Sequence, residues 1–227
     1  MLESRSTQDN LLRFLALCGI AAPIVFAILV TVSGFIYEGY SHVTQAVSEL
    51  GGVEAQYPML QNVNFFVMAV LFVAFAIGLH RGIGGGSGSK LGPLLVGGFG
   101  VSASLGSAFL PCDPGCEFHT LTGTLHNLTG LGGFISGIAG IFVISTRLKR
   151  DPNWQTFYTF SWIAGIATLI ALLLWIGIAK AADVDSVNGL LQRLFVLSWF
   201  VWVEVMALRL FRISAGTRST DTLAARA

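Results

Sequence analysis

Charged side chains are scarce in this sequence. Asp, Glu, Lys and Arg make up 11% of its 227 residues, whereas about 25% is usual for a soluble domain, and hydrophobic residues make up 54%. With a mean hydropathy of +0.73, this deficit indicates an integral membrane protein. A formal net charge of +1 gives no sign of a nucleic-acid partner, and three cysteines are too few for a disulfide framework.

Long apolar stretches take the place of the missing charges. A bilayer core of about 30 Å requires roughly 20 apolar residues in an α-helix, and six stretches meet this length: 11–36, 61–80, 92–110, 125–146, 156–179 and 189–211. Pro23 is predicted to kink the first helix without ending it. The sequence therefore predicts an all-α bundle of six transmembrane helices in residues 11–211, between tails at 1–10 and 212–227 whose outermost residues are expected to be disordered.

The basic residues lie almost entirely on one side of the predicted membrane. Lys and Arg occur before the first stretch, in the second and fourth connections and after the last stretch, whereas the first and third connections contain none. Because cytoplasmic loops carry an excess of Lys and Arg, we expect both termini and both tails in the cytoplasm and the odd-numbered loops outside it. Most acidic residues fall on the outer side, either as solvated loop residues or as part of a cation or acid–base site.

The first outer loop reads YEGYSHVTQAVSELGG and predicts a short amphipathic helix lying on the membrane surface. Ser41 is the expected N-cap, and two glycines from Gly51 onward would stop the helix. His42, Gln45 and Glu49 are spaced to share its polar face. That face is either simply in contact with water or part of a site.

The third loop, within LPCDPGCEFH, holds the densest group of polar and reactive side chains. Asp113-Pro114-Gly115-Cys116 has proline second and glycine third, which is typical of a type II turn and brings Cys112 near Cys116. A disulfide between Cys112 and Cys116 is favoured, because thiols outside a bacterial membrane are usually oxidised. Free thiols and a metal thiolate site stay as alternatives, and the spacing does not match the C-x-x-C redox motif.

Polar and small side chains continue from this loop into the fourth stretch at helical spacing. They form one stripe: His119, Thr122, His126, Thr129, Gly133 and Ser136. The stripe is expected to face the bundle interior, because hydroxyl and imidazole groups are costly in lipid. It serves either helix packing or a ligand or proton-transfer row at the outer mouth. Small residues at four-residue spacing, such as those beginning at Gly98 and Gly133, predict close packing of the third and fourth helices.

The sixth stretch carries Gln192 and Arg193 near its outer end and Glu204 deeper. An arginine inside a span is costly and is expected to be paired. The expected partners are acids of the outer side: Asp113, Glu49, Asp183 or Asp185. Alternatively, the guanidinium fork of Arg193 holds a phosphate or carboxylate headgroup.

The chain resembles a known family in three segments. It is similar to the prokaryotic membrane family called domain of unknown function 998 in GYSHVTQAVSELGG, FLPCDPGCEFHTLTGTLHNLTG and GLLQRLFVLSWFVW. The resemblance covers nearly the whole chain and implies a six-helix, multi-pass protein of a bacterial or archaeal plasma membrane, with no established activity. The positions that match its motifs are Ser48, Glu49, Asp113, His126, Gln192 and Arg193.

Three function classes stay open on this evidence. The favoured one is a structural or accessory membrane protein whose outer polar cluster holds helix ends together. The second is a membrane-embedded hydrolase or transferase acting on lipid at the outer leaflet, and the third is a transporter or sensor for a lipid or small molecule. The expected partners are the bilayer and a lipid or small anionic ligand.

The enzyme class assigns a role to each candidate residue. The predicted catalytic residues are Ser48, Glu49, Asp113 and His126. The predicted ligand-binding residues are Gln192 and Arg193. A divalent metal such as zinc would be held by residue types that it accepts: His42, His119, His126 and Asp113. All of these roles require side chains from several loops to converge on one pocket.

Overall fold

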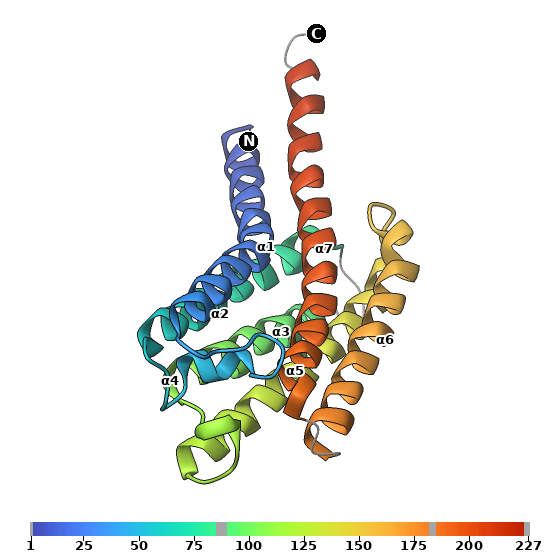
Figure 1. Ribbon diagram of the computed structural model, residues 1–227. Helices are drawn as coiled ribbons and strands as arrows, with labels where there is room; N and C mark the ends of the chain where they lie inside the picture. Colours follow the sequence, from blue (N-terminus) through green and yellow to red (C-terminus); the bar gives the residue numbers. More distant parts are fainter. Residues whose placement is uncertain (1, 85–89, 182–184, 225–227) are drawn as a thin grey trace.

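The fold is a bundle of helices. A computed structural model describes residues 2–84, 90–181 and 185–224, and every regular element in them is helical (Figure 1). Within these residues six segments are long and apolar enough to cross a membrane: Thr7–Ile36, Pro58–Gly82, Leu91–Phe109, Leu121–Leu148, Gln155–Ile178 and Asn188–Ala215. The all-α, six-span prediction is therefore confirmed, and the first span runs through Pro23 without a break.

Four spans are single helices and two are composite. The single helices are α1 (Leu2–Ile36), α2 (Pro58–Gly82), α5 (Leu121–Leu148) and α7 (Asn188–Ala224). The third span joins α3 (Leu91–Phe99), the π-helix η2 (Gly100–Leu105) and α4 (Gly106–Phe109). The fifth joins the 3-10 helix η4 (Gln155–Phe157), α6 (Tyr158–Leu174) and the π-helix η5 (Trp175–Ala181). Short 3-10 helices lie in the connections: η1 (Val47–Gly51), η3 (Pro114–Cys116) and η6 (Asp185–Val187).

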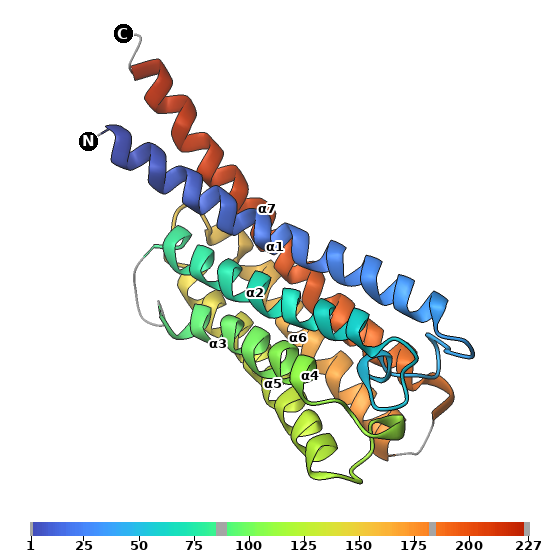
Figure 2. The same ribbon diagram turned by 90° about the vertical axis from the view of Figure 1, so that its left-hand side faces the viewer.

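The spans close into a ring in the order α1, α2, α3, α5, α6, α7, with α7 returning to α1. In Figure 2 the start of α1, the end of α7 and the C-terminal ends of α2 and α5 lie at one end of the bundle. The C-terminal ends of α1, α4 and the fifth span lie at the opposite end. We call this second end, made by residues 37–57 and 110–120 and the start of α7, the odd-loop end.

Aromatic side chains from four helices fill the centre of the ring. Phe72 of α2 is fully buried, and its ring centre lies 5.1 Å from that of Phe99 in α3 and 5.9 Å from that of Phe200 in α7. Phe200 in turn meets Phe26 of α1 edge-to-face at 5.1 Å. Such pairs add about 0.5–1.5 kcal/mol each beyond the burial of their area. They hold the helices around the pocket described below.

The third span and α5 approach each other through small residues. A Cβ atom on Gly133 would lie only 2.5 Å from the backbone nitrogen of Ala103, so no larger residue fits without moving the backbone. Hydroxyl groups also cross the interface, since Ser136 donates to the Leu95 carbonyl at 2.8 Å and Ser102 donates to Thr129 O at 2.7 Å. The predicted close packing of these helices is present.

Two expectations about local structure differ from what is observed. The described parts of the predicted tails are helical, because α1 begins at Leu2 and α7 ends at Ala224. In the first outer loop the expected surface helix shrinks to the five-residue η1. The reason is burial: Val47 and Leu50 of η1 pack under Phe65 of α2 instead of lying on a membrane surface.

Candidate functional site

A pocket of about 590 Å³ opens at the odd-loop end. Its walls come from η1, the third span, the η3 loop, α5, the fifth span and α7. The polar lining residues are Ser48, Ser107, Glu117, His119, His126, Asn127 and Gln192. The principal apolar ones are Phe118, Leu131, Phe134, Leu172, Trp175 and Ile176. The pocket therefore combines a polar end with an apolar wall.

A smaller chamber of about 50 Å³ lies deeper against the aromatic core. Four residues line both spaces and form the boundary between them: Ser48, Ser107, Phe134 and Gln192. Beyond them the inner chamber is bordered mainly by Met68 and phenylalanines, including Phe26, Phe72 and Phe99. The lining of the inner chamber is therefore less polar than that of the outer pocket.

Both π-helices contribute to these walls. Trp175 and Ile176 of η5 line the outer pocket, and Ala103 and Ser104 of η2 line the inner chamber. A π-helical turn is rare and frequently occurs at functional sites. The irregular helix geometry and the cavities therefore coincide.

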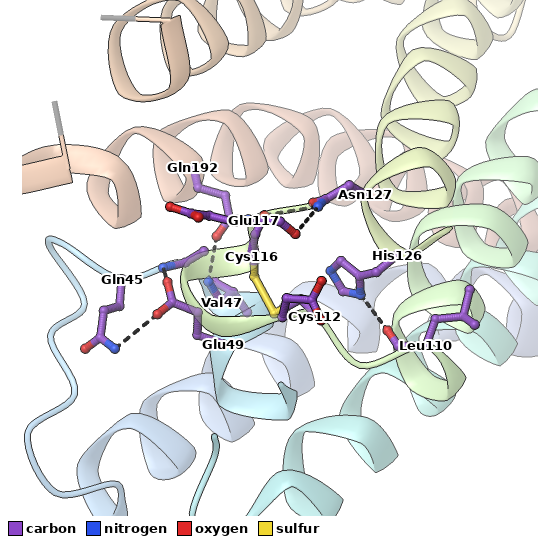
Figure 3. The surroundings of a disulfide bond; sticks show 12 residues. Gln45, Val47, Glu49, Leu110, Cys112, Cys116, Glu117, His126, Asn127 and Gln192 are labelled. Atoms are coloured by element: carbon purple, nitrogen blue, oxygen red, sulfur yellow. Dashed lines mark hydrogen bonds between the residues drawn. A yellow bond between two sulfur atoms is a disulfide. The ribbon is translucent and has the colours of Figure 1, made fainter. Parts of the chain in front are cut away.

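His126 is held on the wall of the outer pocket. Its Nδ1 lies 2.6 Å from the carbonyl oxygen of Leu110, at the end of the third span (Figure 3). Since a carbonyl only accepts hydrogen bonds, this contact assigns the proton of neutral His126 to Nδ1 and leaves the lone pair on Nε2. The ring is 5% exposed, so its orientation is set by packing as well as by that bond.

Ser48 and Gln192 sit at the boundary between the two chambers. The Gln192 side-chain oxygen accepts a 2.6 Å bond from the Val47 N–H, which ties α7 to the start of η1 (Figure 3). Among the described residues the Ser48 hydroxyl makes no hydrogen bond, so it is available to a bound molecule. Ser48 and Gln192 therefore differ in role although both face the same space.

The pocket mouth carries Asn127, Glu117 and His119. The Asn127 amide nitrogen donates to the carbonyls of Cys116 and Glu117, which fixes the η3 loop over α5 (Figure 3). His119 Nε2 lies 3.0 Å from a Glu117 carboxylate oxygen, and both side chains are well exposed. No Lys or Arg is among the described lining residues, so neither residue type brings a positive charge to the described mouth.

Asp113 is not among the lining residues of this pocket and organises the start of α5. Its carboxylate accepts the N–H groups of His119 and Thr120 at 2.9 and 2.7 Å and the Thr120 hydroxyl at 2.8 Å. Thr120 is itself the N-cap, accepting the Gly123 N–H at 3.0 Å. The hydrogen bonds from Thr120 hold the pKa of the Asp113 carboxyl below its usual range. A Cβ on Gly123 would collide with this carboxylate.

Arg193 joins α7 to the first outer loop. Its guanidinium donates to the Gln45 carbonyl at 2.9 Å, to the Tyr40 hydroxyl at 2.6 Å and to His42 Nδ1 at 2.9 Å. Burial, followed by the charge of Arg193, lowers the pKa of His42. We call this group, Arg193 with Tyr40, His42 and Gln45, the Arg193 latch. It satisfies the guanidinium with neutral acceptors and leaves no acid beside it within the described residues.

Glu49 stabilises η1 locally. One carboxylate oxygen accepts the Ala46 N–H at 2.7 Å and the other accepts the Gln45 side-chain amide at 3.1 Å (Figure 3). This is the reciprocal half of an N-terminal capping arrangement. Glu49 therefore supports the backbone on which Ser48 stands, and its carboxylate does not line the pocket.

The predicted site residues thus fall into two groups. Ser48, His119, His126 and Gln192 line the outer pocket. The second group serves backbone or loop contacts instead: His42, Glu49, Asp113 and Arg193. Of the acids expected beside Arg193, Asp183 and the side chain of Asp185 lie outside the described residues.

The structure does not bring the four predicted zinc ligands together. His42 bonds Arg193 in the latch, whereas Asp113 caps the backbone near His119. In the part of the chain that the structure describes, one group does have the spacing of a metal site. It consists of Cys112, Cys116 and His126, whose ligand atoms lie within 4.8 Å of one another. The two cysteines form a disulfide with a Cα–Cα distance of 4.9 Å (Figure 3).

The turn that carries the disulfide is the predicted one. The Cys116 N–H donates to the Asp113 carbonyl at 2.8 Å, which closes the turn. Gly115 has φ 63° and ψ 7°, the left-handed conformation that the third position of a type II turn requires. Cys116 is also left-handed, with φ 54°.

Several residues that build the pocket and the Arg193 latch were not predicted from the sequence. Tyr40 was not singled out, although its hydroxyl is the acceptor at the centre of the Arg193 latch and donates to Ala46 O at 2.9 Å. Asn127 drew no functional prediction, and the apolar wall residues Leu172 and Trp175 read as ordinary span residues. A usable signal was the pair of tyrosines in YEGY together with the arginine in the sixth span, since arginine stacks on tyrosine and donates hydrogen bonds to it.

Comparison with known proteins supports the fold assignment. The model of the family described as "Protein of unknown function (DUF998)" matches residues 20–209, which include all six spans in whole or in large part. No curated protein and no solved structure matches the chain. On the strength of the family match, this multi-pass helical membrane protein belongs to the DUF998 family.

Proposed function

We propose that this protein is an accessory membrane protein that binds one lipid-like amphiphile in the pocket at its odd-loop end. The observation that carries the proposal is the graded pocket itself. Ser48, His126 and Gln192 give its inner face hydrogen-bonding groups, while Leu131, Phe134 and the inner chamber form an apolar path. Binding sites that bury most of a ligand have this composition, with few polar groups on a mainly apolar wall.

The exposed rim favours a ligand that arrives from the bilayer. Phe118, Leu131 and Ile176 line the pocket and are 68%, 40% and 37% exposed. In a membrane protein such side chains contact hydrocarbon, so an acyl chain enters along them without crossing water. Each methylene moved from water to such a site is worth about 0.8 kcal/mol, which makes the chain the main source of affinity.

The charge of the lining favours a neutral or zwitterionic headgroup. Glu117 is the one carboxylate among the described lining residues, and it pairs with His119. Arg193, the residue expected to hold an anion, donates its hydrogen bonds to groups of the latch instead. A phosphate that entered this pocket without a compensating cation of its own would therefore lose its hydration and gain no Lys or Arg partner from the described lining.

We place the odd-loop end on the extracytoplasmic side of a plasma membrane. The support is the distribution of basic residues: Arg81, Lys90, Arg147, Lys149 and Arg150 all belong to the opposite end of the bundle. Because positive residues accumulate on the cytoplasmic side, that end is inside. Labelling of single cysteines placed at Val43 and Lys149 tests this: an impermeant maleimide should modify position 43 alone in intact cells.

Ligand binding can be measured through Trp175, which lines the pocket. A lysophosphatidylcholine with a brominated acyl chain should quench Trp175 in detergent-purified protein, and Trp175→Phe should lose that part of the quenching. Lysophosphatidylglycerol with the same brominated chain should bind at least about tenfold more weakly, equivalent to 1.4 kcal/mol. Equal quenching of parent and Trp175→Phe would refute occupation of this pocket.

Two glycines offer a matched pair of blocking variants. Gly130 lines the pocket and has open space around its Cβ position, as has Gly177, which does not line it. Gly130→Phe should fill the pocket and weaken binding of the brominated lipid at least about tenfold, whereas Gly177→Phe should bind like the parent. Unchanged binding by Gly130→Phe would count against the proposal.

Lipid hydrolysis is the second candidate. The specific observation in its favour is that Ser48, with an unbonded hydroxyl, and His126, with its lone pair on Nε2, line the same pocket. A serine needs an adjacent base to act as a nucleophile. If turnover occurs, Ser48→Ala and His126→Gln should each abolish release of fatty acid from a bound phospholipid, and Ser48→Ala should still quench with the brominated ligand.

A further inference from the structure

Cys112, Cys116 and His126 form a compact group at the wall of the pocket. Their side chains are 1%, 7% and 5% exposed, and their ligand atoms lie within 4.8 Å of one another. We propose that reduction of the Cys112–Cys116 disulfide converts these three residues into a zinc site that is closed in the oxidised protein. This inference does not depend on what occupies the pocket.

The spacing suits a zinc ion with small side-chain movements. Zinc binds thiolate sulfur at about 2.3 Å and imidazole nitrogen at about 2.0–2.1 Å in a tetrahedron, which places neighbouring ligand atoms about 3.5–3.8 Å apart. No two of the three ligand atoms lie more than 4.8 Å apart, about 1 Å beyond that spacing, and the two sulfurs separate once the bond between them is broken. The Cys112 and Cys116 backbones are held in place by hydrogen bonds, since Cys112 O accepts from Val53 N–H and Cys116 O accepts from Asn127. Breaking the S–S bond therefore leaves both sulfurs near His126.

The orientation of His126 is the one a metal ligand requires. Its Nδ1 bonds the Leu110 carbonyl at 2.6 Å, and Figure 3 shows the imidazole standing beside the disulfide with Nδ1 directed at Leu110. Histidine ligands commonly donate their second ring N–H to a backbone carbonyl, which fixes the tautomer and presents the other nitrogen to the metal. The Leu110 carbonyl already makes this contact with His126.

The charge balance suits a buried position. Two thiolates and a neutral imidazole around Zn²⁺ carry no net charge, so the site avoids the cost of an unpaired ion away from water. Cys116 and His126 also line the outer pocket, so a fourth coordination position would face the pocket and accept water or a headgroup oxygen. Three protein ligands with one open position is the arrangement of reactive zinc sites, including those with two cysteines and one histidine.

Reduction of the disulfide and binding of zinc are two separate steps. A phosphine reductant breaks the S–S bond, takes the oxygen of one water molecule to become a phosphine oxide, and leaves the two hydrogens on the two sulfurs. Zn²⁺ then displaces both thiol protons to solvent and forms two Zn–S bonds and one Zn–N bond. The same two sulfurs cannot be thiolate ligands and a disulfide at once, so metal binding and the disulfide exclude each other.

The test compares oxidised and reduced forms of one preparation. Detergent-purified full-length protein, stripped with a chelator, is dialysed against Zn²⁺ with or without a phosphine reductant, and bound zinc is measured by atomic emission. We expect one zinc ion per chain after reduction and none in the oxidised sample. Co²⁺ in place of Zn²⁺ should give a thiolate charge-transfer band in the reduced sample, which reports sulfur ligation directly.

Variants identify the ligands and guard against misfolding. Cys112→Ser and His126→Gln should lose the stoichiometric zinc, whereas Cys18→Ser, which removes the remaining buried cysteine, should keep it. Thermal unfolding of each reduced variant without metal shows whether it is folded. Absence of zinc from the reduced parent, or its retention by Cys112→Ser, would overturn the proposal and leave the cysteines as a covalent staple of the third loop.

Discussion

The contribution of the Arg193 latch to docking of the first outer loop can be estimated from its hydrogen bonds. Arg193→Gln removes three hydrogen bonds from α7 to the first outer loop, those to Gln45, Tyr40 and His42. The bond to Gly189 stays within α7 and adds little to loop docking. Because the guanidinium is half-buried, we take about 1 kcal/mol per loop bond, the value for an ordinary hydrogen bond, in preference to the larger value for a charged one. The loop should therefore lose about 3 kcal/mol of docking free energy.

Hydrogen exchange measures this loss where it occurs. A change of 3 kcal/mol shifts a local opening equilibrium by about two orders of magnitude. Amides of residues 45–49 should exchange about 100-fold faster in Arg193→Gln than in the parent, while those of the aromatic core stay protected. Arg209 of the same helix provides the control, since its hydrogen bonds to described residues go to the Asn153 carbonyl at the other end. Arg209→Gln should leave exchange in residues 45–49 unchanged.

Acidification perturbs the same latch without a mutation. His42 accepts from Arg193 through Nδ1, so it must be neutral in the folded latch, and its pKa is lowered there by burial and by Arg193. A histidine with a depressed folded-state pKa contributes full stability above its unfolded value of about 6.5 and loses it as the pH falls toward the folded value. The protection factors of residues 45–49, which correct for the intrinsic pH dependence of exchange, should therefore fall below about pH 6.5 in the parent and much less in His42→Gln. Parent-like protection of these residues in Arg193→Gln would refute the latch.

Three further outcomes follow from the packing and charge of single side chains. Asp113→Asn should lower the unfolding temperature in detergent at neutral pH. The difference should vanish as the pH falls through the depressed carboxyl pKa, because the stabilising hydrogen bonds go to the ionised form. Glu204→Leu should raise stability by about 1–3 kcal/mol, since one carboxyl oxygen of Glu204 is buried without a partner in the described residues; a loss would indicate an unseen role for the acid. Gly133→Val should cost at least about 1–3 kcal/mol through collision with Ala103, whereas Gly130→Ala should be tolerated; equal stability of both variants would contradict the close approach of α5 to the third span.

The split between adjacent residues explains why the candidate site was only partly predictable. Gln192 and Arg193 are neighbours near the start of α7, yet one contacts η1 at the pocket and the other contacts Tyr40. Successive side chains on an α-helix point about 100° apart, so two adjacent polar residues rarely share one site. Ser48 and Glu49 separate in the same way on η1: the first lines the pocket and the second caps the backbone.

The capping of α5 also explains the position of Asp113, one of the predicted site residues. The start of α5 presents N–H groups without helical partners, and Asp113 lies close enough in sequence to satisfy two backbone N–H groups there. Sequence position alone does not reveal whether a carboxylate faces a cavity or a helix terminus. Both uses place an acid just before a helix.

The sequence by itself determined the six spans, their up-and-down order, the close contact of the third span with α5 and the turn at Cys112–Cys116. These features depend on span length, residue size and local backbone preference, all of which can be read along the chain. Only the tertiary structure decided that His126, Ser48 and Gln192 share a pocket while Arg193 latches a loop. Those placements depend on side-chain directions and on contacts between residues up to about 150 positions apart, for which a single sequence carries no signal.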